Sequence, residues 1–207
     1  MSSKTKEHIV EVAKLMYQKG MADAFSGNIS VREDDNLYIT PSGICKGYLK
    51  EEMIVKTDLE GKIIEGNYRP SSEIKLHLTA YKKRKDAGAA IHAHSPYATA
   101  FAVANKPIET KAYAEMLIFF GKIPLAKYGA PSTEDICSGA EEYIENYDTI
   151  LLANHGIMTV EKDVFNAFFK IEAAESIAKV LILSNIAGGE KDLTDEQIRQ
   201  LSNIRKI

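Results

Sequence analysis

Two histidines spaced two residues apart interrupt an apolar run near the middle of the chain. His92 and His94 lie in AAIHAHSP, residues 89–96, where most neighbours are small or aliphatic. If this run forms a strand, both imidazoles point to the same face, because side chains alternate with a period of two. Burying two adjacent imidazoles without partners is costly, and a shared metal ion removes that cost. The spacing indicates a metal site, with two hydrogen-bonded core histidines as the alternative.

A third imidazole and a carboxylate could complete such a site. His155 follows the apolar run TILLAN and precedes Gly156, at the end of a predicted strand, where catalytic side chains are common. Glu73 follows Pro-Ser-Ser in the first turn of a predicted helix, where the helix dipole favours an anion; an ordinary helix-start acid is the alternative. Three imidazoles and one carboxylate suit Zn²⁺. His77 is a rival ligand, which we expect instead in the core or behind the ligands.

Three short loops share small residues, hydroxyl groups and exposed backbone amides. They are SGNIS (26–30), TPSG (40–43) and PSSE (70–73). Glycine lets a ligand approach the backbone closely, and serine and asparagine supply hydrogen-bond donors. A helix that begins after the third loop adds positive partial charge. Together the loops suit a phosphate group held without Lys or Arg, whereas each taken singly could be an ordinary turn.

Hydrophobic periodicity and turn residues predict the elements that position these side chains. Residues 107–122 are ambiguous. Helices are expected at the N-terminus up to Gly20 and over 72–85 (capped by Ser71 or Ser72), 96–105, 132–147 (capped by Ser132 or Thr133), 164–189 and 194–207. Strands are expected as hairpins within 26–43, 53–66 and 149–163, and as single runs within 88–95 and 122–129.

The length and the order of these elements indicate one α/β domain. A chain of 207 residues can bury a substantial core, and it shows no repeat, low-complexity segment or linker. Short hairpins dominate the first third, so we expect a largely antiparallel sheet. A single domain over residues 1–207 is the prediction.

Composition and charge exclude several classes of partner. A net charge of −3 and the lack of a dense basic stretch argue against nucleic acid. The first 20 residues lack the continuous apolar core of a signal peptide, and no apolar run is long enough to cross a membrane. Cys45 and Cys137 match no metal or redox spacing, which suits a reducing cytosol. We therefore expect a cytoplasmic protein that binds neither nucleic acid nor membrane.

Taken in order, SGNIS, ITPSG, PSSE, HAHSP and NHG resemble the class II aldolase/adducin family, from about residue 7 to about residue 185. The resemblance implies a three-layer α/β/α fold with a central, mostly antiparallel sheet. It also implies a homotetramer with active sites at subunit interfaces. One Zn²⁺ per subunit would bind His92, His94 and His155, with Glu73 as an exchangeable fourth ligand.

The same resemblance implies a reaction and a substrate. The enzyme would reversibly cleave a ketose 1-phosphate, such as L-fuculose 1-phosphate, to dihydroxyacetone phosphate and an aldehyde such as lactaldehyde. Glu73 would be the general base, and Tyr113 from a neighbouring subunit would protonate the aldehyde oxygen. Around Tyr113 the sequence matches the family poorly, and the C-terminal tail lacks the aromatic residue that the family's aldolases often carry. The implied phosphate ligands are Gly27, Asn28, Ser42, Gly43, Ser71 and Ser72.

Related activities remain as alternatives. A methylthioribulose-1-phosphate dehydratase or a pentulose-phosphate 4-epimerase would keep the same metal ligands. The family's epimerases carry Asp at the last position of the third loop, so Glu73 favours an aldolase. A non-enzymatic scaffold of the adducin type has no physical need for the ligands and phosphate loops. A zinc hydrolase from outside the family would leave the three small-residue loops unexplained.

Overall fold

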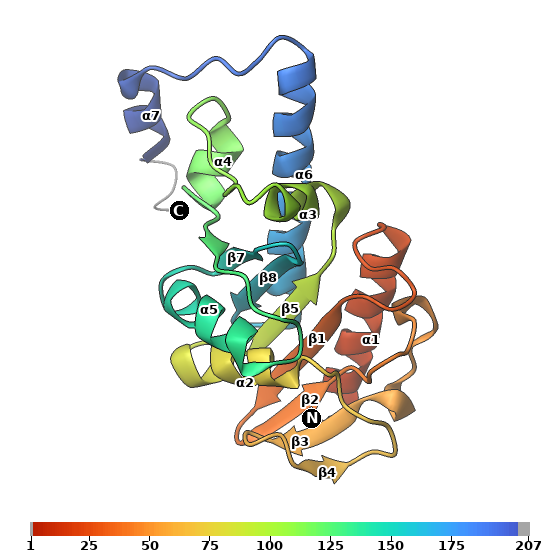
Figure 1. The fold of residues 1–207 in the computed structure, drawn as a ribbon. Coiled ribbons are helices and arrows are strands. Elements are labelled where there is room, and N and C mark those ends of the chain that lie inside the picture. The colour runs from red at the N-terminus through yellow and green to blue at the C-terminus, as the bar shows by residue number, and fades with distance from the viewer. Residues whose placement is uncertain (1, 203–207) are drawn as a thin grey trace.

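Eight strands form one sheet in the structure, a computed structural model that describes residues 2–202 (Figure 1). The strands are β1 (Asn28–Glu33), β2 (Asn36–Ile39), β3 (Val55–Asp58), β4 (Ile63–Glu65), β5 (Ala89–Ala93), β6 (Leu125–Ala126), β7 (Thr149–Leu152) and β8 (Gly156–Glu161). Their order is β4-β3-β2-β1-β5-β8-β7-β6, so β1 and β5 are central. Every neighbouring pair is antiparallel except β6 and β7.

Helices cover both faces of this sheet. They are α1 (Ser2–Gln18), α2 (Ile74–Lys83), α3 (Pro96–Val103), α4 (Ala114–Phe119), α5 (Glu134–Asn146), α6 (Val164–Ile186) and α7 (Asp195–Ser202), with short 3₁₀ helices η1 (Lys46–Tyr48) and η2 (Glu51–Met53). One core cluster joins α1, α3 and α6 to one face, and a second joins α2 and α5 to the other. The predicted mostly antiparallel α/β fold with three layers is confirmed.

The alternation of side chains along the two central strands separates the cores and places polar groups on one face. Ile29 of β1 pairs with Ile91 of β5, and both face the α1–α6 core. Asn28 pairs with His92, and Ser30 with Ala90, which belongs to the α2–α5 core. The side chains of Asn28, Ser30 and His92 therefore point toward α2, as the period of two requires.

Most element predictions agree with the structure, and the differences have local causes. Thr133 caps α5, accepting from the backbone N–H of Asp135 at 3.2 Å. Ser71 and Ser72 do not cap α2: Glu73 itself is the residue before its first turn, and Ser71 Oγ accepts from the Glu73 N–H at 3.3 Å. The prediction that Glu73 lies inside the first turn is therefore wrong by one position.

The regions with weak sequence signals form short pieces. In the ambiguous stretch, an isolated bridge between Ile108 and Ile123 flanks α4. The strand predicted within 122–129 shortens to the two residues of β6, because its backbone pairs only with β7. The C-terminal helix is described as α7, and positions 203–207 of its predicted range lie outside the described residues.

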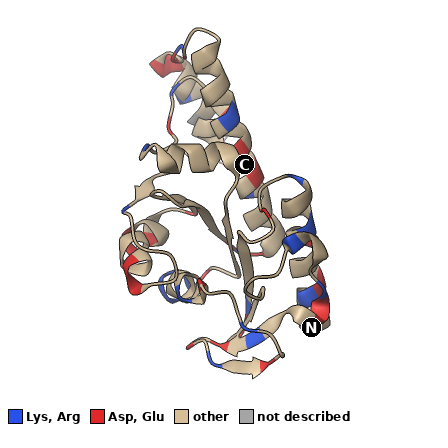
Figure 2. Ribbon diagram, turned by 45° about the vertical axis from the view of Figure 1, so that its right-hand side comes forward, with Lys and Arg blue, Asp and Glu red and all other residues tan. Residues whose placement is uncertain are grey.

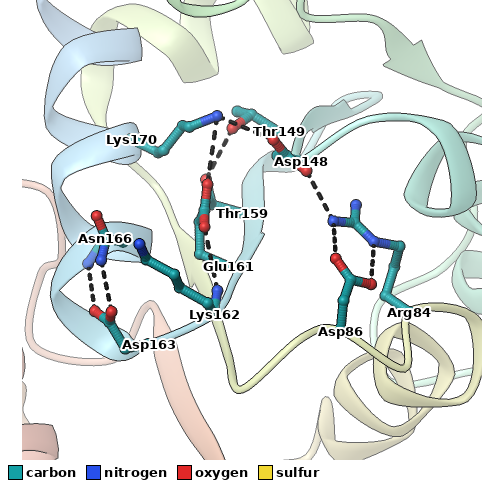
Figure 3. A network of polar contacts seen from close by, with 10 residues as sticks. All are labelled: Arg84, Asp86, Asp148, Thr149, Thr159, Glu161, Lys162, Asp163, Asn166 and Lys170. Carbon is teal, nitrogen blue, oxygen red and sulfur yellow. Dashed lines mark hydrogen bonds and ion pairs between the residues drawn. The ribbon is translucent and has the colours of Figure 1, made fainter. Parts of the chain in front are cut away.

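A charged network connects helices on opposite faces of the sheet (Figure 3). Asp148, just before β7, accepts from Arg84 Nη2 at 2.9 Å and from Lys170 Nζ at 3.0 Å. Arg84 follows α2, and Lys170 lies on α6. Arg84 also pairs with Asp86 through two hydrogen bonds of 2.9 and 2.8 Å. Asp148 thus links both helical layers at one end of β7.

Charges elsewhere are mixed. Figure 2 shows acidic and basic residues interspersed over the helices and loops. Within residues 2–202, no helix combines the length and the apolar character that crossing a membrane requires.

Candidate metal and substrate site

Three imidazoles converge where β5 ends and the β7–β8 hairpin turns. His92 belongs to β5, His94 follows it on the same face, and His155 lies in the turn before β8. Their candidate ligand nitrogens all lie within 4.8 Å of one another, and the Nε2 atoms of His92 and His94 are 2.9 Å apart. The spacing argument for a shared face therefore agrees with the geometry.

Gly156 allows the hairpin to approach the histidine strand. A Cβ atom at this position would lie 2.5 Å from the Ala93 carbonyl oxygen and 3.1 Å from His92 Cε1. The preceding turn also places Asn154 in the left-handed region, with φ of 57°, which asparagine tolerates better than most residues. The sequence Asn-His-Gly thus delivers His155 because its neighbours accept a tight turn against β5.

The Glu73 carboxylate faces two of the imidazoles. Glu73 Oε2 lies 3.5 Å from His92 Nε2, and Oε1 lies 3.5 Å from His155 Nε2. The side-chain amide of Asn28 donates to Oε2 at 2.8 Å. Oε1 is buried and has no hydrogen-bond partner among the described residues. One carboxylate oxygen is anchored and the other is left unsatisfied.

Burial keeps the three imidazoles in their neutral form. It lowers the pKa of His92 well below the ordinary value, with a further contribution from His155 and His94. Burial is also the main cause of the lowered pKa of His94 and of His155. Because the Ile157 carbonyl only accepts, His92 Nδ1 must donate to it, at 3.0 Å, which leaves Nε2 with a lone pair toward the site.

This arrangement fits a divalent metal ion. Neutral imidazole nitrogens and a carboxylate oxygen are the donors that such ions bind. Buried Glu73 Oε1 and His155 Nδ1 lack hydrogen-bond partners among the described residues, which is costly unless another group satisfies them. The convergence of His92, His94 and His155 is therefore explained by a metal better than by ordinary core packing.

A cleft of about 170 Å³ opens beside the triad. All six residues expected to bind phosphate line it, although they come from three separate loops. Glu73, His94, His155 and Lys46 line it as well. The side chain of Asn28 is occupied on both sides, since Nδ2 donates to Glu73 and Oδ1 contacts His77. The six residues of the cleft that are expected to bind phosphate are Gly27, Asn28, Ser42, Gly43, Ser71 and Ser72.

Lys46 is a cleft residue that the sequence analysis missed. Its side chain is buried, and Nζ donates to the Ile44 carbonyl at 3.0 Å. Burial lowers the pKa of Lys46, and the Asp23 charge nearby opposes that shift. Lys46 follows Gly43 by three residues, but a single lysine after a turn is too common in sequences to predict a binding residue. Only the fold places Lys46 in the same cleft as Gly27 and Gly43.

Two other expected residues lie apart from the triad. Tyr113 immediately precedes α4, packs against the α1–α6 core and does not line the cleft. His77 is fully buried behind Asn28, and its two ring nitrogens contact Ser30 and Asn28. His77 therefore does not join the triad. It lies behind the triad, as expected from the sequence.

Comparison with known proteins places this fold and site in a class. Residues 7–182 match the family described as Class II Aldolase and Adducin N-terminal domain. The chain therefore belongs to the class II aldolase and adducin family. Together with the histidine triad and the relatives below, this makes the protein a class II, metal-dependent aldolase-family enzyme.

Individual relatives cover nearly the whole chain. The chain is 36% identical over 179 residues to the L-fuculose phosphate aldolase of Methanocaldococcus jannaschii, which is 86% of this chain and 96% of that protein. It is 33% identical over 202 residues to the 5-deoxy-D-ribulose 1-phosphate aldolase of Bacillus thuringiensis, covering 96% and 94%. A solved structure of L-fuculose 1-phosphate aldolase matches with a TM-score of 0.91 at 32% identity, covering 100% of this chain and 98% of that one.

Proposed function

We propose that the protein is a zinc-dependent aldolase that reversibly cleaves a ketose 1-phosphate to dihydroxyacetone phosphate and an aldehyde. The observation that carries this proposal is the histidine triad beside one cleft, which His94, His155, Glu73 with its unsatisfied oxygen and the three small-residue loops line. Relatives named for L-fuculose phosphate and 5-deoxy-D-ribulose 1-phosphate support a deoxyketose phosphate as substrate. L-fuculose 1-phosphate, with lactaldehyde as product, is the first candidate.

The chemistry divides between the metal ligands and a base. His92, His94 and His155 would hold one Zn²⁺ per subunit, with Glu73 as an exchangeable fourth ligand. When bound, the ion supplies Lewis-acid stabilisation of the negative charge that develops on the ketose fragment. In the synthetic direction, Glu73 removes the carbon-bound proton of dihydroxyacetone phosphate at Oε1. The hydrogen bond from Asn28 keeps Oε2 in place while Oε1 exchanges partners.

The loops would hold the phosphate group of the substrate. Gly27 and Gly43 both adopt positive φ, of 76° and 72°, and expose backbone at the cleft without a side chain over it. Ser42, Ser71 and Ser72 add hydroxyl groups there. Backbone and hydroxyl donors of this kind form anion sites. Lys46 contributes a cationic group, so the phosphate is not held by neutral donors alone.

The acid that protonates the aldehyde oxygen would come from another subunit. We assign it to Tyr113, the residue that the resemblance to the family implies. Because Tyr113 does not line the cleft of its own chain, it would act across an interface. Exposed apolar side chains on the last turns of α6, at Val180, Leu183 and Ile186, support burial in an oligomer. A homotetramer predicts a mass in light scattering of four times the chain mass of 22.9 kDa. A monomer in solution would contradict this assignment.

An aldehyde panel with dihydroxyacetone phosphate tests the reaction. We expect a new ketose phosphate with lactaldehyde or a similar short aldehyde, loss of activity with a chelator, and recovery when Zn²⁺ is restored. Loss of water from methylthioribulose 1-phosphate would instead identify a dehydratase, and inversion of a pentulose phosphate an epimerase. No turnover of any of these compounds by zinc-loaded protein would contradict the proposed reaction and favour a scaffold.

A further inference from the structure

A chain of buried polar side chains leads from α2 to the carboxylate of Glu73. Tyr81 OH lies 2.8 Å from Ser30 Oγ, and Ser30 Oγ lies 2.6 Å from His77 Nδ1. His77 Nε2 lies 2.5 Å from Asn28 Oδ1, and Asn28 Nδ2 donates to Glu73 Oε2 at 2.8 Å. All five side chains are buried. We call this series the Tyr81–Glu73 relay.

The direction of the hydrogen bonds follows from the carboxylate end. An ionised carboxylate only accepts, so Asn28 must present its NH₂ group to Glu73 and its oxygen to His77. An amide oxygen also only accepts, so His77 must donate from Nε2. A neutral imidazole carries one N–H, so Nδ1 must accept, and Ser30 Oγ must be the donor to it. From Ser30 onward, every donor in the relay therefore points toward Glu73.

At the other end of the relay, the Tyr81 hydroxyl group has two possible acceptors. The Tyr81 hydroxyl faces both Ser30 Oγ at 2.8 Å and the Ser30 carbonyl oxygen at 3.0 Å, so its proton has an acceptor in either direction.

Burial lowers the pKa of His77 to about 4, so the ring is neutral at physiological pH. A neutral ring is what the series requires, because an imidazolium would have to donate at both nitrogens.

We propose that His77, as the Nε2–H tautomer, is a positioning residue that fixes the Asn28 amide and thereby holds Glu73 with Oε2 anchored and Oε1 free. If the amide of Asn28 turned over, its oxygen would face Glu73 Oε2, and two acceptors would meet. His77 prevents this because its Nε2–H requires the amide oxygen. The catalytic consequence rests on the proposed role of Glu73, whereas the tautomer and the amide orientation do not.

The tautomer can be measured without substrate. In the full-length protein labelled with ¹⁵N-histidine, long-range proton–nitrogen correlations distinguish a protonated Nε2 from a protonated Nδ1. The spectrum of His77→Gln identifies the His77 signals by their absence. We expect a protonated Nε2 and an unprotonated Nδ1 for His77. A protonated Nδ1 would overturn the proposal, even if the protein proved not to be an aldolase.

Two substitutions separate positioning from packing. Glutamine at position 77 offers an N–H donor toward Asn28 and an acceptor toward Ser30, whereas leucine fills space and offers neither. We expect His77→Leu to lower kcat 10- to 100-fold and to weaken zinc binding by a similar factor, because the loss of groups that orient metal ligands through hydrogen bonds has effects of this size. KM is expected to change little, and His77→Gln is expected to restore most of kcat and of zinc affinity.

A matched control removes the effect of lost stability. Thr159 is fully buried on β8, where its hydroxyl lies 3.4 Å from that of Thr149, outside the relay and the cleft. Thr159→Val also alters a buried polar contact of the sheet, and we expect wild-type kcat and zinc affinity from it. Equal impairment of His77→Gln and His77→Leu, or wild-type kcat and zinc affinity in folded His77→Leu, would overturn the proposal.

Discussion

At the scale of single residues, the two oxygens of Glu73 have different environments, and this difference predicts the outcome of a conservative change. Glu73→Gln keeps the size of the side chain but cannot accept the substrate proton. We expect kcat to fall 10²- to 10⁴-fold, the usual contribution of a general base, while the thermal unfolding midpoint changes little. Steady-state kinetics and calorimetry on the same preparation check this. Near-wild-type turnover would remove Glu73 from the mechanism.

The histidine triad predicts the metal content of the protein. His92→Ala and His155→Ala each remove one of three converging donors, so bound zinc should fall well below one ion per chain. Elemental analysis after dialysis gives the ratio directly. His8→Ala is the matched control, because His8 lies on α1 and packs edge-on against Phe165. Unchanged zinc in both triad variants would contradict the site.

Lys46 predicts a selective effect on phosphorylated substrates. Lys46→Met keeps the length of the chain but removes the charge, and hydrogen bonds to charged groups contribute about 1.5–3 kcal/mol. We expect KM for the sugar phosphate to rise about 10- to 100-fold, on the basis of that energy, with a smaller effect on kcat. Lys50→Met removes an exposed charge four residues away and should leave KM unchanged. Equal KM values in the two variants would exclude Lys46 from phosphate binding.

At the scale of elements, the contact between the β7–β8 hairpin and β5 decides whether the triad assembles. Gly156→Ala places a methyl group 2.5 Å from the Ala93 carbonyl oxygen, so the hairpin must shift away from His92 and His94. Overpacking of this kind costs about 1–3 kcal/mol. We expect a lower free energy of unfolding in urea and weaker zinc binding. Zinc affinity unchanged from wild type would show that the hairpin position does not matter for the site.

The link that Asp148 makes between α2 and α6 predicts a dependence of stability on pH. Burial disfavours the carboxylate, but Lys170 and Arg84 outweigh this and lower the pKa of Asp148 in the fold. A carboxyl group with a lowered folded pKa stabilises the protein fully above its unfolded value, about 4, and this contribution disappears as the pH falls through the folded value. The stability difference between wild type and Asp148→Asn should therefore shrink below about pH 4 in urea titrations. A constant difference would contradict the linkage.

Most of the elements and part of the site could be predicted from the sequence. Strong alternation and helical periodicity identified the hairpins of β1–β4, strand β5 and helix α6, and the His-x-His spacing identified a shared face. β6 was overestimated because its apolar run pairs with one neighbour over two residues only. Lys46 could not be predicted as a cleft residue, because loops from separate parts of the chain form the cleft. The relay through His77 could not be predicted either, because it depends on contacts such as that of His77 with Ser30, which are 47 residues apart.

At the scale of the whole molecule, one sheet spans the described residues, and both helical layers pack on it. We propose that residues 1–207 form a single domain, and we expect one cooperative unfolding transition by calorimetry and by circular dichroism. The two probes should give coincident midpoints at a fixed protein concentration, since an oligomer makes the midpoint depend on concentration. Two separated transitions would contradict a single domain.

The shared cleft has a consequence for how fast the ion exchanges with solution. His92 is fully enclosed, whereas His94 and His155 border the opening that the three loops surround. An ion that departs through this opening passes the place where the sugar phosphate is proposed to sit. A seated ligand should therefore lengthen the residence time of the ion, and capture by a coloured chelator should slow as sugar phosphate is added. Turnover would then protect the enzyme from demetallation, and depletion of substrate would expose it.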